Sequence, residues 1–237
     1  MSGDDERGRD EEGLNGLPSR RLIPALRGFS CILWGMPISI LLYVQAIEVA
    51  TLGRFCIPSY VAGVLIITIG MVFFYVAKME SVFWRKTSRG GLFASCILIY
   101  LGPFVYWFTY LPRVGIYYIG NFILMIISFH WLLWSVNQLA SEIGAMTGDL
   151  DLAIEARICA WSVVAFMLVP LVLIVMLSGV FAQRYESNLL SEIQGLRNNT
   201  PIWAQMFFFL PLPFTMVAAW KAKERCLSEL GRIVEAG

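Results

Sequence analysis

Charged residues are scarce in this 237-residue chain. Only 15% of its residues are Asp, Glu, Lys or Arg, whereas 58% are hydrophobic. A soluble domain of this size has a large surface to cover, and about 25% of its residues are usually charged. The net charge of +1 also gives no sign of the basic surface that nucleic acids require. The composition therefore predicts an integral membrane protein, with the lipid bilayer as a partner and no nucleic acid partner.

Groups that carry chemistry are also few. The chain has one histidine, His130, and five cysteines that form no C-x-x-C pair. Zinc and iron–sulfur sites need such clusters, so neither a metal nor a cofactor is expected. The sequence contains no P-loop, no Rossmann fingerprint and no G-x-S-x-G or H-E-x-x-H motif. These absences argue against an enzyme.

Long uncharged runs are the main positive feature. There are six of them, and every charged residue lies outside them. Their lengths are close to the roughly 20 residues that a helix needs to cross the hydrocarbon core of a bilayer. We therefore predict an all-α, polytopic bundle of six transmembrane helices. The predicted spans cover residues 28–47, 57–77, 90–111, 114–136, 158–182 and 202–220.

The boundary between the third and fourth spans depends on Pro112. Between Gly90 and Val136 the only charged residue is Arg113. A single helix over this stretch would be more than twice as long as the ~30 Å hydrocarbon core. Proline ends a helix, and an arginine beside it can reach the membrane interface. The two spans are therefore predicted to form a hairpin.

The basic residues predict the orientation, because Lys and Arg near membrane spans stay in the cytoplasm. With the N-terminus inside, 14 of them lie in cytoplasmic segments and four lie outside. Both termini are therefore predicted to be cytoplasmic, which in a bacterium means the inner membrane. Residues 1–27 are predicted to form a largely disordered acidic tail, and residues 221–237 a C-terminal helix.

Two connections between spans have a helical pattern of their own. In residues 137–157, Leu139 and Ile143 share one helix face, so a short helix on the membrane surface is expected there, chiefly as a cover that closes the end of the bundle. Asp149 is predicted to cap the helix that leads into the fifth span. Residues 185–196, on the outer side, have a similar pattern and a similar expected position.

His130 is the first candidate functional residue, because an ionisable group inside a membrane is costly and often functional. It suits a hydrogen bond between helices, a quinone contact, a proton relay or one haem ligand. Asn121 is a polar candidate in the same span. The other candidates are prolines within spans, since each removes a backbone hydrogen bond and can kink its helix. They are Pro37, Pro103, Pro170 and Pro211.

Part of the sequence suggests an internal repeat. Ser-Cys-Ile-Leu occurs at residues 30–33 and again at residues 95–98. Pro37, Pro103 and Pro170 recur at nearly equal intervals, and these intervals match the offset between the two Ser-Cys-Ile-Leu segments closely. Both features fit three tandem helical hairpins inserted in the same direction.

Three functions agree with these patterns. A non-catalytic accessory or scaffolding subunit of a membrane assembly agrees with the missing catalytic groups and with an aromatic content of 14%. Its partners would be other membrane proteins or further copies of the chain. A small transporter or channel agrees with the repeat and the central prolines. A redox or lipid-handling protein would depend on His130.

Overall fold

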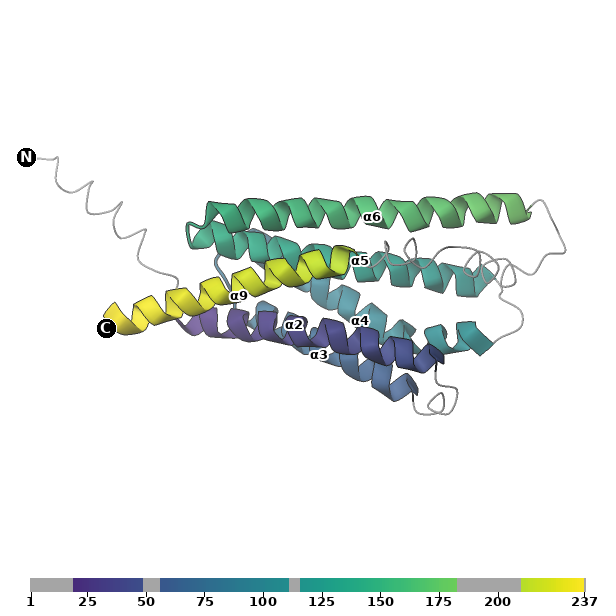
Figure 1. The fold of residues 1–237 in the computed structure, drawn as a ribbon, viewed down its shortest axis with the longest axis horizontal. Helices are drawn as coiled ribbons and strands as arrows, with labels where there is room; N and C mark the ends of the chain where they lie inside the picture. Colours follow the sequence, from purple (N-terminus) through teal and green to yellow (C-terminus); the bar gives the residue numbers. More distant parts are fainter. Residues whose placement is uncertain (1–18, 49–55, 111–115, 183–209, 237) are drawn as a thin grey trace, which may run out of the picture.

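The computed structural model describes residues 19–48, 56–110, 116–182 and 210–236 (Figure 1). These residues form six helices and no strand, so the predicted all-helical class is confirmed for this part of the chain. The helices are α2 (Ser19–Glu48), α3 (Cys56–Val76), α4 (Val82–Tyr110), α5 (Ile116–Met146), α6 (Leu150–Ala182) and α9 (Pro211–Ala236).

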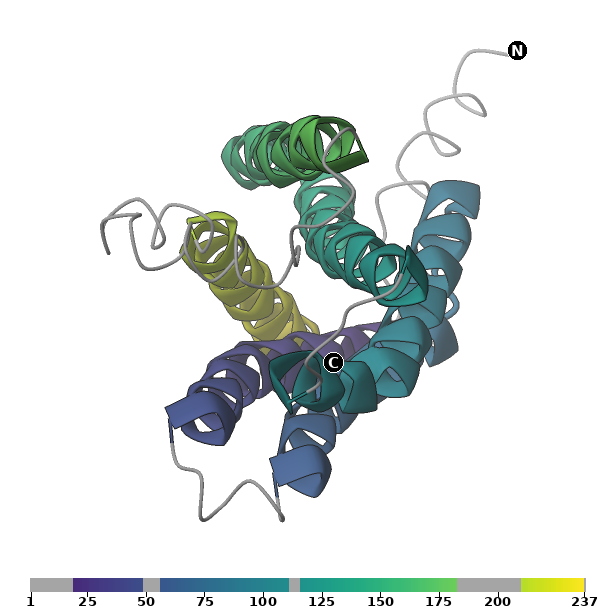
Figure 2. The same ribbon diagram turned by 90° about the vertical axis from the view of Figure 1, so that its right-hand side faces the viewer.

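The helices form an elongated bundle. Each helix from α2 to α6 packs against the next one in the chain, and α9 packs against α2, α5 and α6. The helices α2, α3, α4, α5 and α9 therefore close a ring, and α6 lies outside it (Figure 2). The turns at residues 77–81 and 147–149 lie at the same end of the bundle as the start of α2 and the end of α9 (Figure 1). We call this end the turn end.

Small residues allow α2 and α3 to approach closely. Gly28 and Gly35 on α2 are seven residues apart, as are Gly63 and Gly70 on α3, so each pair lies on one helix face. A Cβ atom on Gly70 would lie 3.0 Å from the carbonyl oxygen of Gly28, and one on Gly63 would lie 2.7 Å from Cα of Ser39. The two backbones are thus nearly in contact, which larger residues would prevent.

Aromatic side chains fill the core beside the α3–α4 turn. Phe74 packs edge-on against Phe29 and Trp84, with ring centroids 4.7 Å and 5.8 Å apart. Trp84 is fully buried, and its Nε1 donates a hydrogen bond to the Phe74 carbonyl oxygen at 2.9 Å. This carbonyl lies in the last turn of α3, where carbonyl groups lack a partner within the helix. The bond therefore satisfies both the buried indole N–H and a carbonyl at the helix end.

The turn between α5 and α6 confirms one prediction and corrects another. Asp149 caps α6 as predicted, since its Oδ1 accepts a hydrogen bond from the Leu152 backbone N–H at 3.0 Å. Gly148, with φ of 70°, allows the sharp reversal. The surface helix predicted within residues 137–157 is wrong, because Leu139 and Ile143 are fully buried in the bundle core. Their apolar face packs within the same cluster as residues of α9 and not on a membrane surface.

Two stretches of the described helices are long and apolar enough to cross a membrane. They are Arg20–Leu42 in α2 and Ile123–Met146 in α5, and Val61–Val76 in α3 is a shorter apolar stretch. The six-span arrangement therefore stays a prediction. So does the predicted orientation.

Other predicted segments lie partly or wholly outside the described residues. Residues 1–18 of the predicted tail and the outer segment 185–196 are not described. Residues 19–27 form the first turns of α2, and residues 221–236 form the last turns of α9. The helix α4 ends before Pro112, and α5 begins after it. The two helices pack against each other, as the predicted hairpin requires.

Candidate functional site

The residues selected from the sequence are spread over five helices, so no single element positions them. Pro37 lies in α2, Pro103 in α4, Asn121 and His130 in α5, Pro170 in α6 and Pro211 at the start of α9. The α2 helix continues through Pro37. Pro37, Pro103 and Pro170 follow the first residues of their helices by 18, 21 and 20 positions. The three prolines thus occur at similar distances from the turn end.

The two polar candidates on α5 bond to their own helix. Nδ1 of His130 lies 2.9 Å from the Ile126 carbonyl oxygen, and Asn121 Nδ2 donates to the Tyr117 carbonyl oxygen at 3.0 Å. The His130 side chain is only 7% exposed. Contacts to the carbonyl four residues earlier hold a polar side chain within its own helix. Neither contact by itself forms a catalytic or ligand-binding arrangement.

Pro211 belongs to a polar contact between α5 and α9. Its carbonyl oxygen accepts a hydrogen bond from Thr215 Oγ1 at 2.8 Å. Thr215 Oγ1 in turn accepts one from Asn137 Nδ2 at 2.8 Å, and both side chains are fully buried. Proline suits the first turn of a helix, where its missing N–H is not needed. The bonds fix the start of α9 against α5.

Asn137 carries an unusual buried atom. Its Oδ1 is buried without a hydrogen-bond partner among the described residues. Its Nδ2 donates to the Leu133 carbonyl oxygen at 3.0 Å, so exchanging the two amide atoms would place two acceptors against each other. An unsatisfied buried acceptor costs about 1–3 kcal/mol. Sequence reasoning missed Asn137 because it lies one residue past the predicted end of the fourth span.

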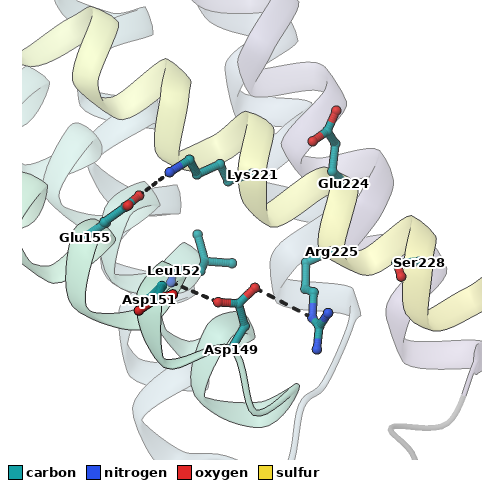
Figure 3. Close-up of a pocket in the computed structure, with 8 residues that line it drawn as sticks. All are labelled: Asp149, Asp151, Leu152, Glu155, Lys221, Glu224, Arg225 and Ser228. Atoms are coloured by element: carbon teal, nitrogen blue, oxygen red, sulfur yellow. Dashed lines mark hydrogen bonds and ion pairs between the residues drawn. The ribbon is translucent and has the colours of Figure 1, made fainter.

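A polar cleft of about 470 Å³ lies at the turn end, between the first turns of α6 and the middle of α9 (Figure 3). Its lining carries four carboxylates and two cations. Figure 3 shows the Lys221 side chain reaching Glu155 and that of Arg225 reaching Asp149. The lining residues are Asp149, Asp151, Leu152, Glu155, Lys221, Glu224, Arg225 and Ser228.

Arg225 makes most of the contacts across the cleft. Its Nη2 donates to the Thr147 carbonyl oxygen at 2.8 Å, and its Nε donates to Thr147 Oγ1 at 3.2 Å. The guanidinium also lies 3.3 Å from Glu229 Oε1 and 3.9 Å from Asp149 Oδ2. Because Thr147 directly follows the last residue of α5, Arg225 places a positive charge at the carboxyl end of that helix, where it is favourable.

Lys221 makes a second link between α9 and α6. Its Nζ forms an ion pair with Glu155 Oε2, and both side chains are about half exposed. The hydrogen bond to Glu155 raises the pKa of Lys221, so the lysine stays charged at neutral pH. An exposed ion pair of this kind contributes little to the stability of the contact between α9 and α6.

The lining of the cleft is suited to joining helices. It contains neither histidine nor cysteine, so Ser228 has no histidine beside it to act as a base. Among the described residues, no group of three or more His, Cys, Asp and Glu could hold a metal ion. Lys221 and Arg225 instead pair with Glu155 and Asp149 across the cleft. We call the contacts of Arg225 and Lys221 with the α5–α6 region the α9 joint.

The α9 joint could not be found in the sequence. Asp149 was recognisable as a helix cap, but Arg225 follows Thr147 by 78 residues, and no local pattern connects these two. Comparison with known proteins found no family model, no curated protein and no solved structure that matches the chain.

Proposed function

We propose that this protein is a multi-pass membrane protein with six spans and both termini in the cytoplasm. We further propose that it acts as a non-catalytic accessory or scaffolding subunit of a membrane assembly. The observation that carries the proposal is the exposure of large apolar side chains around the whole bundle.

Large apolar side chains are exposed on all six described helices. Single exposed apolar residues are normal on soluble proteins, but exposure on every helix of a bundle is typical of contact with lipid or with another protein. Here the exposed positions also occur on α6, which packs only on one side of the ring. Examples are Trp34 on α2 (70% exposed), Phe93 on α4 (69%), Trp161 on α6 (65%) and Val217 on α9 (55%).

The charges support the proposed orientation. In the described part of the chain, every charged residue except Glu48 lies toward the turn end. There are 12 Lys and Arg and eight Asp and Glu in this group. Because basic residues accumulate on the cytoplasmic side of membrane proteins, this distribution supports a cytoplasmic turn end.

The polar groups inside the bundle support a packing role more than a transport path. Ser95 Oγ and Ser135 Oγ donate to backbone carbonyls of their own helices, at 2.8 Å in each case. Ser141 Oγ donates to the Ala153 carbonyl oxygen at 2.8 Å and so links α5 to α6. The Ser141 bond stabilises a contact between two helices, and the other two hydroxyls are satisfied within their own helices. The Oδ1 of Asn137, which has no partner among the described residues, favours the transporter alternative instead.

Two measurements test the proposal. Membranes that contain the protein are first washed with alkaline carbonate, and we expect the protein to stay in the pellet until detergent is added. The detergent extract is then cross-linked and its mass measured, with a stable assembly larger than one chain expected. Release by carbonate contradicts the membrane placement. A monomer that moves a solute across reconstituted vesicles contradicts the scaffolding role and supports the transporter.

A further inference from the structure

We infer that the corner formed by the end of α3 and the start of α4 binds the phosphate group of an anionic phospholipid. The inference rests on the membrane placement proposed above. We call this surface the basic corner, and its cations are Lys78, Arg85, Lys86 and Arg89.

The basic corner has an uncompensated positive charge. Its four cations are close together in the sequence and are all exposed. Glu80 is the only carboxylate in the stretch that they span, and its Oε1 already binds Arg21 Nη1 at 2.7 Å. In the described part of the chain, none of the four cations forms an ion pair. Four adjacent like charges repel each other, so an anion that joins them is favoured.

The opposite side of the turn end behaves differently. Arg225 is paired with Glu229 and Asp149, and Lys221 is paired with Glu155. Three of the five cations on α6 and α9 therefore have a carboxylate partner, whereas none of the four cations of the basic corner has one among the described residues. This contrast distinguishes the basic corner from the side of the turn end formed by α6 and α9.

The position of Arg89 suits a lipid headgroup. Its guanidinium carbon lies 5.7 Å from the ring centroid of Tyr75, which is itself exposed at the end of α3. Arg85 lies one helical turn before Arg89, so both cations lie on one face of α4. Tyrosines occur where a membrane protein meets the headgroups, and a guanidinium can bind two phosphate oxygens at once.

Exposed apolar side chains border these cations. Val76 is 53% exposed at the end of α3, and Phe93 is 69% exposed one turn beyond Arg89. A phospholipid joins a phosphate to acyl chains, so it matches both parts of this surface, whereas inorganic phosphate matches only the cations. The acidic residues 4–12 of the same chain match only the cations as well. These two sources of negative charge are separate outcomes of the experiment.

The experiment measures the melting temperature of the full chain in nanodiscs of phosphatidylcholine, with and without phosphatidylglycerol. We expect phosphatidylglycerol to raise the melting temperature, and native mass spectrometry to find retained phosphatidylglycerol. The triple variant R85Q/K86Q/R89Q should lose both effects. The control variant R157Q/K223Q/R232Q removes the same number of cations from α6 and α9 and should keep both effects. If the triple variant does not fold, the single variant R85Q replaces it and should show a reduced shift.

Each other outcome has a definite meaning. If phosphatidylglycerol raises the melting temperature of the triple and control variants equally, the inference is overturned, because the effect then depends on net charge alone. A full shift from inorganic phosphate in phosphatidylcholine discs would assign the corner to free phosphate. If neutralising the acidic residues 4–12 lowers the melting temperature of the parent chain but not of the triple variant, the tail occupies the corner. Release by carbonate would instead refute the membrane placement itself.

Discussion

At the scale of single residues, Arg225 and Asn137 distinguish two kinds of polar contact. Arg225 is partly exposed and has several acceptors, so its charge is well matched. Asn137 is fully buried and has one atom without a partner among the described residues. The first contact should stabilise the fold, whereas the second contributes little or nothing to stability. Each expectation can be measured by substitution.

Replacing Arg225 by Met should lower the free energy of unfolding by about 1–2 kcal/mol, because bonds from a charged donor to Thr147 are lost. The matched control is Arg232→Met, on the same helix. Arg232 is 64% exposed, and its one ion pair within the described part of the chain is with Glu229, three residues earlier, so the effect should be well under about 1 kcal/mol. Denaturant unfolding in detergent compares the two variants. Equal effects would mean that Arg225 contributes no more than a surface charge.

Replacing Asn137 by Leu should change the stability by less than about 1 kcal/mol, since it removes an unsatisfied acceptor together with the bond to Thr215. Asn137→Asp has nearly the same shape but places a carboxylate in the core, and it should destabilise the protein by several kcal/mol. Thermal unfolding of both variants makes the comparison. A large loss for Asn137→Leu would show that Oδ1 is engaged by a donor from outside the described residues.

At the scale of helices, the sequence predicted local features well. The first five uncharged runs indicated where α2 to α6 lie, and Pro112 and Asp149 indicated helix boundaries, because these effects operate within a few residues. Most of α9 lies after the sixth run, in sequence that contains charged residues. The length of α5 and α6 was underestimated, since Leu139 and Ile143 have the pattern of a membrane-surface helix and of a core helix alike. Only packing against α9 distinguishes the two, and that contact is not encoded locally.

The candidate site was predicted less well for the same reason. His130 and the prolines are conspicuous because of their type, but the contacts that join helices depend on ordinary residues far apart in the chain. Asn137 and Thr215 are 78 positions apart, and their bond became visible only in the folded bundle. A single sequence shows which residue types are unusual, but it does not show which distant residues are in contact in the folded protein.

The close approach of α2 and α3 gives a prediction at this scale. Gly70→Ala should destabilise the protein by about 1–3 kcal/mol, because the new methyl group meets the Gly28 carbonyl oxygen at 3.0 Å. Gly120→Ala is the control. A Cβ at Gly120 has nothing within 4 Å among the described residues, so the better helix propensity of alanine should stabilise α5 by roughly 0.5–1 kcal/mol. If both substitutions change the stability in the same direction, the close approach of α2 and α3 is contradicted.

At the scale of the whole molecule, the proposed orientation places the turn end in the cytoplasm. Cys226 is a poor reporter of this orientation, because it is fully buried and its burial raises the pKa of the thiol to about 12. A thiol that stays protonated inside the protein reacts slowly with maleimides on either side of a membrane. A better reporter is an introduced cysteine at an exposed position near the end of α9.

In a cysteine-free background, Val234→Cys should react with an impermeant maleimide only after the membrane is permeabilised. Val234 is 79% exposed, so burial cannot explain a lack of labelling in intact cells. Arg113→Cys, in the predicted outer connection, is the matched control and should react in intact cells. Labelling of Val234→Cys from outside, with Arg113→Cys protected, would reverse the orientation.

Closure of the ring by α9 also has a consequence for the order of assembly. Most of the chain lies between the end of α2 at Glu48 and the start of α9 at Pro211, although the two helices are neighbours in the finished bundle. At about 5–20 residues per second, a ribosome needs roughly 8 to 30 s to make the intervening chain. During that interval α2 and α3 can already be paired, while the faces of α2 and α5 that receive α9 have no permanent neighbour. With the proposed membrane placement, the newly inserted protein would therefore pass through a long-lived open stage, in which the membrane insertion machinery has access to its future interior.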